Sequence, residues 1–191
     1  ATAAGDRVLL NVTDLRCSVV IATYNRSQLL LRTLTALAQQ DLDPREFEVI
    51  VVNDGSSDST DAVLGTAKMP YALRHFRQDN RGPAAARNLA IQNASTPIII
   101  TLDDDVIPHP ELVRRHLEAQ ESEQHIASIG VMVLPPDKRL SIWSEWDAAM
   151  LLKQYAAMLQ GRYPPTPRQF YTANASFRKT DAGVAQTVGE L

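Results

Sequence analysis

The sequence predicts an α/β fold in which helices flank a mostly parallel central sheet. Short runs rich in Val, Ile and Thr recur along the chain, and helical spacing of apolar residues follows most of them. The chain has 191 residues, of which 45% are hydrophobic and 21% charged. That length is enough to bury one core, and the composition is typical of a globular protein. We therefore expect a single compact unit.

The apolar, β-branched runs predict six strands. The second and fourth are strongly apolar (FEVIVV and PIIITL), whereas the third alternates only weakly. The expected strands are residues 17–23, 47–52, 71–76, 97–102, 126–134 and 170–177.

Four helices are expected between these strands. The first follows Ser27, which we expect as its N-cap, and the second covers about 59–67. The third begins at Pro83, because proline suits the first position of a helix, and the fourth covers about 110–124. From residue 135 onward the pattern loosens, and no further helix is predicted.

Composition excludes several classes of function. A net charge of -3 argues against nucleic-acid binding by bulk electrostatics. No apolar stretch approaches the ~20 residues of a membrane span, and the first 16 residues lack the apolar centre of a signal peptide. The single cysteine, Cys17, fits a reducing compartment. We expect a cytoplasmic protein, with peripheral membrane contact left open.

Polar residues follow four of the predicted strands. The segments are 23–26 (TYNR), 53–58 (NDGSSD), 79–82 (DNRG) and 103–105 (DDD). In open parallel sheets, ligands bind beyond the carboxyl ends of the strands. A polar ligand is therefore expected at this edge.

Asp103, Asp104 and Asp105 form the most specific of these segments. In an extended chain, Asp103 and Asp105 lie on one side and Asp104 on the other. Adjacent carboxylates repel each other unless a cation or hydrogen-bond donors neutralise them. Mg²⁺ and Mn²⁺ take oxygen ligands, often one or two carboxylates together with phosphate oxygens of a substrate. The cluster predicts a metal that clamps a diphosphate; the alternative is a solvated loop or a helix cap.

The other strand ends have a ligand-binding and a structural interpretation. Asp54 could accept hydrogen bonds from a base N–H or a ribose hydroxyl, while Ser57 or Asp58 caps the next helix. Arg87 lies one turn inside the third helix and faces either a phosphate or solvent. The four histidines show no metal-ligand spacing.

Four segments together resemble family 2 glycosyltransferases. They are SVVIATYNR (18–26), EVIVVNDGSSDST (48–60), NRGPAAARNLAI (80–91) and IITLDDDVIPHPEL (99–112). Their order and spacing match the family from Ser18 to about Leu117, and NASFRK (174–179) is similar to its segment near the acceptor site. The resemblance implies a GT-A fold, a nucleotide-sugar donor, a Mn²⁺ or Mg²⁺ ion and inversion at the anomeric carbon.

The resemblance also implies residues of the nucleotide pocket. By position, Thr23, Tyr24 and Asn25 line the pocket, and Asp54 holds the base. Uracil nucleotides are the expected donors by their frequency in the family, with guanine and thymine nucleotides as alternatives. The acceptor is an unknown glycan, lipid or small molecule.

The remaining implied residues lie on the phosphate and sugar side. Arg81 and Arg87 lie near the nucleotide or its phosphates. Asp103 and Asp104 meet the ribose and the sugar, and Asp105 holds the metal, with Asp103 as a second ligand.

One feature departs from the family pattern. Members usually carry a Glu-Asp pair after the NASFR-like segment, and this pair supplies the catalytic base. The last 12 residues (TDAGVAQTVGEL) contain no such pair, and Asp181 and Glu190 are their only carboxylates. Glu190 is the candidate base, and the alternative is that the base is absent from this chain.

We therefore predict three segments along the chain. Residues 1–16 are an N-terminal extension, 17–134 form the nucleotide-sugar-binding GT-A core, and 135–191 are a partial, truncated acceptor-side region. In the last segment, four aromatic residues form either a platform for an acceptor sugar or part of the core. They are Trp143, Trp146, Tyr155 and Tyr171.

Two alternative functions compete with a transferase. A sugar-phosphate nucleotidyltransferase would need a glycine-rich phosphate loop after the first strand, where this chain has ATYNRS. A non-catalytic nucleotide-sugar-binding or degenerate transferase domain of a larger synthase is favoured by the missing Glu-Asp pair. The intact carboxylates at 103–105 favour metal chemistry instead.

Overall fold

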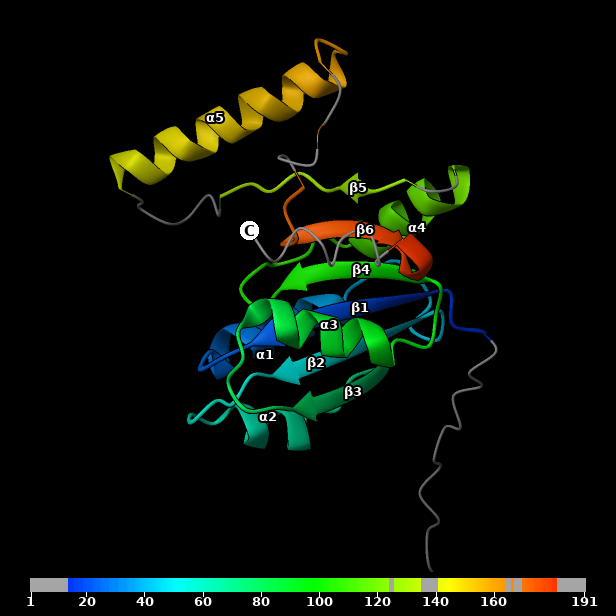
Figure 1. Cartoon of the computed structure of the whole chain (residues 1–191), viewed down its shortest axis with the longest axis vertical. Helices are drawn as coiled ribbons and strands as arrows, with labels where there is room; N and C mark the ends of the chain where they lie inside the picture. Colours follow the sequence, from blue (N-terminus) through cyan, green and yellow to red (C-terminus); the bar gives the residue numbers. More distant parts are fainter. Residues whose placement is uncertain (1–13, 124–125, 135–140, 164–165, 167–169, 182–191) are drawn as a thin grey trace, which may run out of the picture.

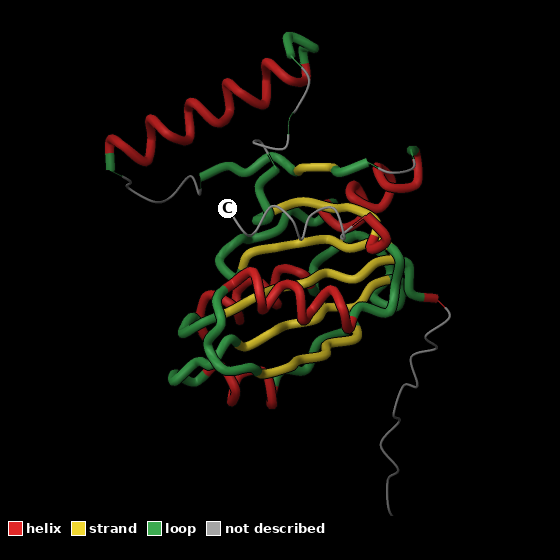
Figure 2. Tube along the Cα trace, viewed as in Figure 1, coloured by secondary structure: helices red, strands yellow, loops and turns green. Residues whose placement is uncertain are grey.

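The computed structural model describes residues 14–123, 126–134, 141–163, 166 and 170–181. Six strands form one sheet in the order β3-β2-β1-β4-β6-β5 (Figures 1 and 2). The first four strands run parallel, β6 is antiparallel to β4, and β5 is antiparallel to β6. The predicted α/β fold with a mostly parallel sheet is confirmed. The strands are β1 Cys17–Thr23, β2 Phe47–Asn53, β3 Ala72–Arg77, β4 Ile98–Asp103, β5 Ser128–Ile129 and β6 Asn174–Arg178.

Helices cover both faces of this sheet (Figure 1). One core cluster joins β1, β2 and β4 to α1, α2 and α4, and the second joins the opposite face of the same strands to α3. Neighbouring residues of β1 therefore point to different clusters, Val19 to the first and Val20 to the second, as the pleat of a strand requires. The helices are α1 Ser27–Leu37, α2 Thr60–Thr66, α3 Pro83–Asn93, α4 Leu112–Ser122 and α5 Ile142–Leu159.

The buried strands follow the sequence prediction closely. β1 has the predicted bounds, and the ends of β2, β3 and β4 differ from the prediction by one residue. All seven residues of β2 are buried. A strand covered on both faces reads as a continuous apolar run, and such runs are easy to find in a sequence.

Four details of the prediction are wrong. The last strand begins at Asn174 rather than at residue 170, because residues 172–173 form a turn. The N-cap of α1 is Arg26, and Ser27 is the first helical residue. The strand expected over 126–134 is only Ser128–Ile129, because β6 begins at Asn174, opposite Gly130, and offers no partner beyond it. Residues 142–159, where no helix was expected, form α5.

Beyond residue 134, the chain returns to the sheet. β6 lies between β4 and β5, and Phe177 of β6 belongs to the second core cluster. The sheet therefore uses residues on both sides of position 134, and the division into three segments stays a prediction. None of the helices within the described ranges has the length and hydropathy needed to cross a membrane.

Candidate functional site

The carboxyl ends of the parallel strands lie level at one edge of the sheet. Thr23 at the end of β1 pairs with Asn53 at the end of β2, and Ala22 pairs with Asp103 at the end of β4. Asn53 in turn pairs with Arg77, the last residue of β3. The polar segments that follow these strands are thereby brought to a common edge, which we call the rim.

Asn25 joins the loop after β1 to the loop after β2. Its side-chain Oδ1 accepts a hydrogen bond from the backbone N–H of Ser57 at 2.7 Å, and its own backbone N–H donates to the Ser56 hydroxyl at 2.9 Å. Asn25 has a positive φ of 53°, a conformation that asparagine tolerates better than most residues. Its neighbour Tyr24 is 47% exposed, so the Tyr24 ring is accessible at the rim.

Asp58 connects the same two loops from the other side. One carboxylate oxygen accepts from the backbone N–H of Ser27 at the start of α1, and the other accepts from the backbone N–H and hydroxyl of Thr60 at the start of α2. These hydrogen bonds, led by the Thr60 hydroxyl, lower the pKa of Asp58 to about 2. Asp58 thus accepts from the first backbone N–H of both helices, but the N-cap of α2 is Ser59 rather than the predicted Ser57 or Asp58.

Asp54 is buried, and its carboxylate holds the segment after β3. Oδ1 accepts from the Gln78 side chain at 2.7 Å and from the backbone N–H of Arg81 at 2.9 Å. Oδ2 accepts from the backbone N–H of Gly82 at 2.9 Å. The loop that carries Arg81 is therefore positioned by Asp54, whereas contact of Asp54 with a base stays a prediction.

Arg87 lies against the end of β4. Its Nη2 donates to Asp103 Oδ1, while its Nε is buried and has no hydrogen-bond partner among the described residues. Arg81, by contrast, is exposed. Arg81 precedes α3 in the sequence, whereas Arg87 lies inside the helix. Of these two arginines, Arg87 alone forms an ion pair with the acidic segment among the described residues.

Asp104 is the buried member of the acidic segment, only 4% exposed. Its carboxylate accepts from the Thr23 hydroxyl at 2.7 Å and from Arg26 Nη1 at 3.1 Å. Burial raises the pKa of Asp104, and the hydrogen bonds from Thr23 and Arg26 oppose that rise. The Asp104 side chain therefore holds the end of β4 against β1, and its contact with the ribose or sugar stays a prediction.

Asp105 is the exposed member of the segment. Its carboxylate lies 3.0 Å from Arg26 Nη1, the same nitrogen that contacts Asp104. β4 ends at Asp103, and a turn follows. Strict alternation of the three aspartates, expected for an extended chain, is therefore lost after Asp103, and one guanidinium reaches both following carboxylates.

The rim fits a metal that is shared with a substrate. No group of three metal-binding side chains lies together in the residues that the structure describes. Asp103 and Asp105 offer hard oxygen ligands, and Mg²⁺ or Mn²⁺ usually takes only one or two carboxylates, with phosphate oxygens and waters completing the shell. The donor set therefore suits a diphosphate-bound divalent ion.

Sequence reasoning missed Arg26 as a member of this site. Arg26 stands in the TYNR segment after the first predicted strand, directly after Asn25, but no role was predicted for it. Its partners Asp104 and Asp105 lie 78 and 79 positions away, so only the fold reveals the contact. The sequence did offer a signal: a basic residue directly follows one predicted strand, and an acidic run directly follows another.

The remaining predicted residues lie in or near the last part of the chain. Glu190 falls outside the described residues. Trp143 and Trp146 are 80% and 56% exposed, so they do not belong to the core. Tyr155 is buried and Tyr171 is 38% exposed. Within the described residues, the aromatic side chains of α5 that are open to a ligand are therefore the two tryptophans.

A family comparison covers most of the chain. The model of the family described as "Glycosyl transferase family 2" matches residues 18–182. Curated relatives include an uncharacterized glycosyltransferase, YfnE, of Bacillus subtilis (strain 168), which is 37% identical over 118 residues, 61% of this chain and 30% of YfnE. Validoxylamine A glucosyltransferase of Streptomyces hygroscopicus subsp. limoneus is 41% identical over 104 residues, 53% of this chain and 23% of that protein. The chain thus spans less than a third of these relatives.

Solved structures share the fold. The mannosyltransferase PcManGT from Pyrobaculum calidifontis, in complex with GDP-Man and Mn²⁺, superposes with a TM-score of 0.70 at 21% identity over 92% of this chain and 48% of PcManGT. S. aureus TarS 1–349, in complex with UDP, gives a TM-score of 0.69 at 19% identity over 90% of this chain and 49% of TarS. At these identities, the likeness concerns the arrangement of the elements.

Proposed function

The chain belongs to glycosyl transferase family 2, and from this premise we propose that it binds a nucleoside-diphosphate sugar at the rim and transfers the sugar to an acceptor hydroxyl with inversion. The observation that carries the proposal is that three strands end level with one another. Their last residues are Thr23, Asn53 and Asp103. A ligand that spans this edge meets the loop of Asp54, the acidic segment and Arg87 in one extended contact. A nucleoside-diphosphate sugar is such an extended ligand, since it presents a nucleoside, a diphosphate and a sugar in that order.

The nucleoside is proposed to lie between the loops after β1 and β2. Tyr24 offers an exposed ring, and Asn25 holds the two loops together through Ser56 and Ser57. Asp54 is proposed to accept a hydrogen bond from the base. Each carboxylate oxygen has two lone pairs, and Oδ2 has a single described partner, so Asp54 can take a further donor without losing the loop.

The diphosphate is proposed to lie over the end of β4. Arg87 carries a buried Nε without a described partner, and a phosphate oxygen is an acceptor that would satisfy a guanidinium donor. Asp105 and Asp103 would hold a Mn²⁺ or Mg²⁺ ion, which supplies positive charge to the leaving phosphate oxygens. Arg81 is proposed to approach the nucleotide from the neighbouring loop.

The reaction is proposed as a single displacement. The acceptor oxygen forms a bond to the anomeric carbon while the bond from that carbon to the diphosphate oxygen breaks, so the configuration inverts. The acceptor proton goes to a carboxylate base, and the electron pair of the broken bond stays on the leaving diphosphate. Glu190 is the proposed base of this chain.

We propose a UDP-sugar as the donor and the cytoplasm as the location. TarS in its solved complex binds UDP, whereas PcManGT binds GDP-Man, so proteins of this fold bind uracil and guanine nucleotides. The single, buried Cys17 is in keeping with a reducing compartment. The acceptor is proposed to carry the reacting hydroxyl on a glycan, a lipid or a small molecule.

Calorimetric titration with UDP, GDP and TDP, each with and without Mn²⁺, tests the donor site. We expect UDP to bind most tightly and Mn²⁺ to strengthen its binding. Release of UDP from UDP-sugars in the presence of candidate acceptors then tests transfer. Failure of all three nucleotides to bind would refute the proposal.

Binding without transfer is the result expected of the second candidate, a nucleotide-sugar-binding domain of a larger synthase.

A further inference from the structure

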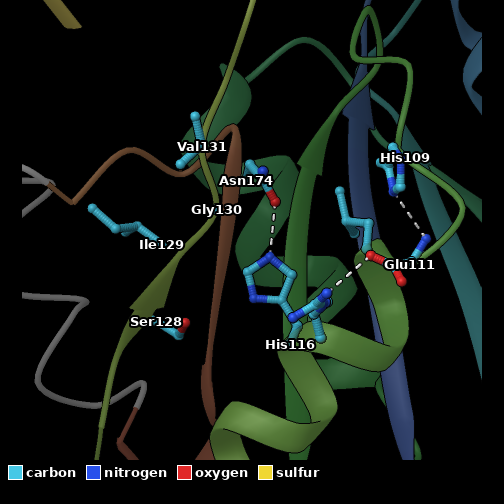
Figure 3. A pocket seen from close by; sticks show the side chains of 10 residues that line it. His109, Glu111, His116, Ser128, Ile129, Gly130, Val131 and Asn174 are labelled. Atoms are coloured by element: carbon cyan, nitrogen blue, oxygen red, sulfur yellow. Dashed lines mark hydrogen bonds and ion pairs between the residues drawn. The ribbon is translucent and has the colours of Figure 1, made fainter. Parts of the chain in front are cut away.

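A cavity of about 220 Å³ lies beside the rim, on the side of the sheet that α4 covers (Figure 3). The first turn of α4 forms one wall, and β5 with the residues after it forms the other. Pockets for drug-sized ligands measure roughly 300–1,000 Å³, so this space suits a smaller occupant. The lining includes Glu111, Leu112, Arg115, His116, Gly130 and Asn174.

Asn174 offers an unpaired donor to this cavity. The residue is only 6% exposed, and its Oδ1 lies 2.8 Å from Nε2 of buried His116 (Figure 3). The other ring nitrogen of His116 lies 2.9 Å from the Ser176 hydroxyl. His116 therefore donates from Nε2 to Asn174 and accepts from Ser176. The side-chain Nδ2 of Asn174 has no hydrogen bond within the described residues, although it belongs to a residue more than nine-tenths buried.

Gly130 leaves the space that this amide needs. A Cβ atom at position 130 would lie 2.2 Å from Asn174 Nδ2, closer than two such atoms can approach. The backbone N–H of Gly130 also donates to the Asn174 carbonyl at 2.9 Å. The amide is thus held by His116 and flanked by a residue without a side chain, and all three residues line the cavity.

The charge of the lining argues for an uncharged ligand. The guanidinium of Arg115 is paired with Glu111 at 3.1 Å, so the two charged groups compensate each other. The start of α4 is not open to an anion either. The backbone N–H of Val113 donates to the Gln40 side chain at 2.9 Å, and that of Leu112 donates to the His109 carbonyl at 2.9 Å. Glu111 at the N-cap adds negative charge there.

Apolar side chains complete the lining. Leu112 comes from α4, Ile129 from β5, and Val131 from the residues that follow β5. An occupant must therefore combine an apolar surface with oxygen atoms that accept from an amide N–H, and it must be small and uncharged. A sugar ring meets all these conditions, since it has C–H faces and carries hydroxyl and ring oxygens at its edge.

We propose that this cavity binds one uncharged sugar ring of the acceptor, with an oxygen of the ring accepting a hydrogen bond from Asn174 Nδ2. The identification of the sugar as part of the acceptor rests on the proposed function. Asn174 pairs with Leu102, the residue before Asp103, so the ring lies close in register to the acidic segment. Leu102 belongs to the core cluster on the α4 side, whereas Asp103 pairs with Arg87 of α3. The bound ring is thus separate from the diphosphate and anchors the acceptor beside it.

Nitrogen–proton correlation NMR of the whole chain tests the proposal directly. D-Glucose, D-galactose and N-acetylglucosamine are added separately, with neither nucleotide nor metal present. We expect at least one of them to shift the side-chain amide signals of Asn174 saturably, and glucose 6-phosphate to bind more weakly. Absence of a saturable shift at Asn174 with all three neutral sugars would overturn the proposal.

A pair of glycine variants supplies the matched control. Gly130→Ala places a methyl group against the amide and should weaken sugar binding at least fivefold. Gly65→Ala in α2 should leave it unchanged, because a Cβ at position 65 has no atom within 4 Å. The double variant Gly130→Ala/Asn174→Ala removes the crowded amide and restores room, yet it should still not bind sugar, because the donor is lost. Sugar binding by the double variant equal to that of the unmodified chain would refute the role of Asn174.

Titration of the same variants with UDP and Mn²⁺ separates this proposal from the proposed function. Nucleotide binding with no response of Asn174 to sugars refutes the cavity proposal alone. A sugar response at Asn174 without nucleotide binding supports the cavity as a sugar site and refutes the proposed donor site.

Discussion

Replacing Asp105 by Asn separates metal binding from nucleoside binding at the rim. The substitution keeps the shape of the side chain and removes its charge. Asp105 is exposed and shares Arg26 with Asp104, so its own ion pair is a surface contact worth about 0–1 kcal/mol. The fold should therefore be nearly as stable as before, and Arg26 keeps its second partner.

The expected loss lies in the metal-dependent part of diphosphate affinity. In the part of the chain that the structure describes, Arg26 is the only hydrogen-bond partner of the Asp105 carboxylate, which leaves one of its oxygens available to a cation. A charge-assisted contact contributes about 1.5–3 kcal/mol, which corresponds to roughly a tenfold or greater loss of affinity. Uridine, which lacks phosphates, should bind Asp105→Asn as it binds the unmodified chain.

Calorimetric titration with UDP and with uridine, each with and without Mn²⁺, measures this contrast. Asp43→Asn is the matched control, because Asp43 is also a surface carboxylate paired with an arginine, Arg45, and lies outside the rim. The control should keep the full effect of Mn²⁺. If Asp105→Asn also kept it, the proposed metal site at Asp105 would be wrong.

Three further predictions concern the rim and the buried histidine. Asp54→Ala should weaken uridine binding by a similar factor with and without Mn²⁺ in calorimetry; unchanged affinity for the nucleoside would contradict its role toward the base. Arg26→Ala should raise the affinity for Mn²⁺ in the absence of nucleotide, measured by the loss of the free-ion paramagnetic resonance signal, because a cation no longer competes for Asp105; an unchanged affinity would count against a metal there. Burial lowers the pKa of His116 in the folded chain, so folding loses stability as the pH falls below the unfolded value of about 6.5. In urea unfolding, the stability difference between the unmodified chain and His116→Gln should therefore be smaller at pH 5.5 than at pH 7.5, and an equal difference at both would refute this linkage.

The parallel strands were predictable because burial on both faces selects continuous β-branched runs. β5 was not, because its length depends on where a distant strand begins. Nine consecutive residues from position 126 have a strand-like composition, but only two pair with β6, which starts at Asn174. Pairing is a property of two segments, and the sequence of one of them cannot reveal it.

α5 was missed for a different reason. Its apolar residues lie on all sides, with Ile142 and Leu159 each 84% exposed, so the segment has no clear apolar face to detect. Its ends do carry signals. Ser141 caps the first turn by accepting from the backbone N–H of Ser144, and Gly161 has a positive φ of 66° directly after the helix.

The acidic segment illustrates the limit of sequence reasoning within the site. Three identical residues in a row are equivalent in the sequence, and their ranking depends on which neighbours the fold brings to each. The buried Asp104 accepts hydrogen bonds from Thr23 and Arg26, and Asp103 accepts one from Arg87. The exposed Asp105 is thus the aspartate least committed to other protein groups.

This division has a consequence for metal binding. A carboxylate that already neutralises a buried arginine has less to offer a second cation, since both compete for the same negative charge. Arg87 is the more buried of the two arginines, with a side chain 19% exposed against 49% for Arg26. Its pair with Asp103 is therefore harder to displace than the pair of Arg26 with Asp105. Of the two aspartates proposed as metal ligands, Asp105 should accordingly provide the first contact, and Asp103 should join only when a phosphate takes over its arginine.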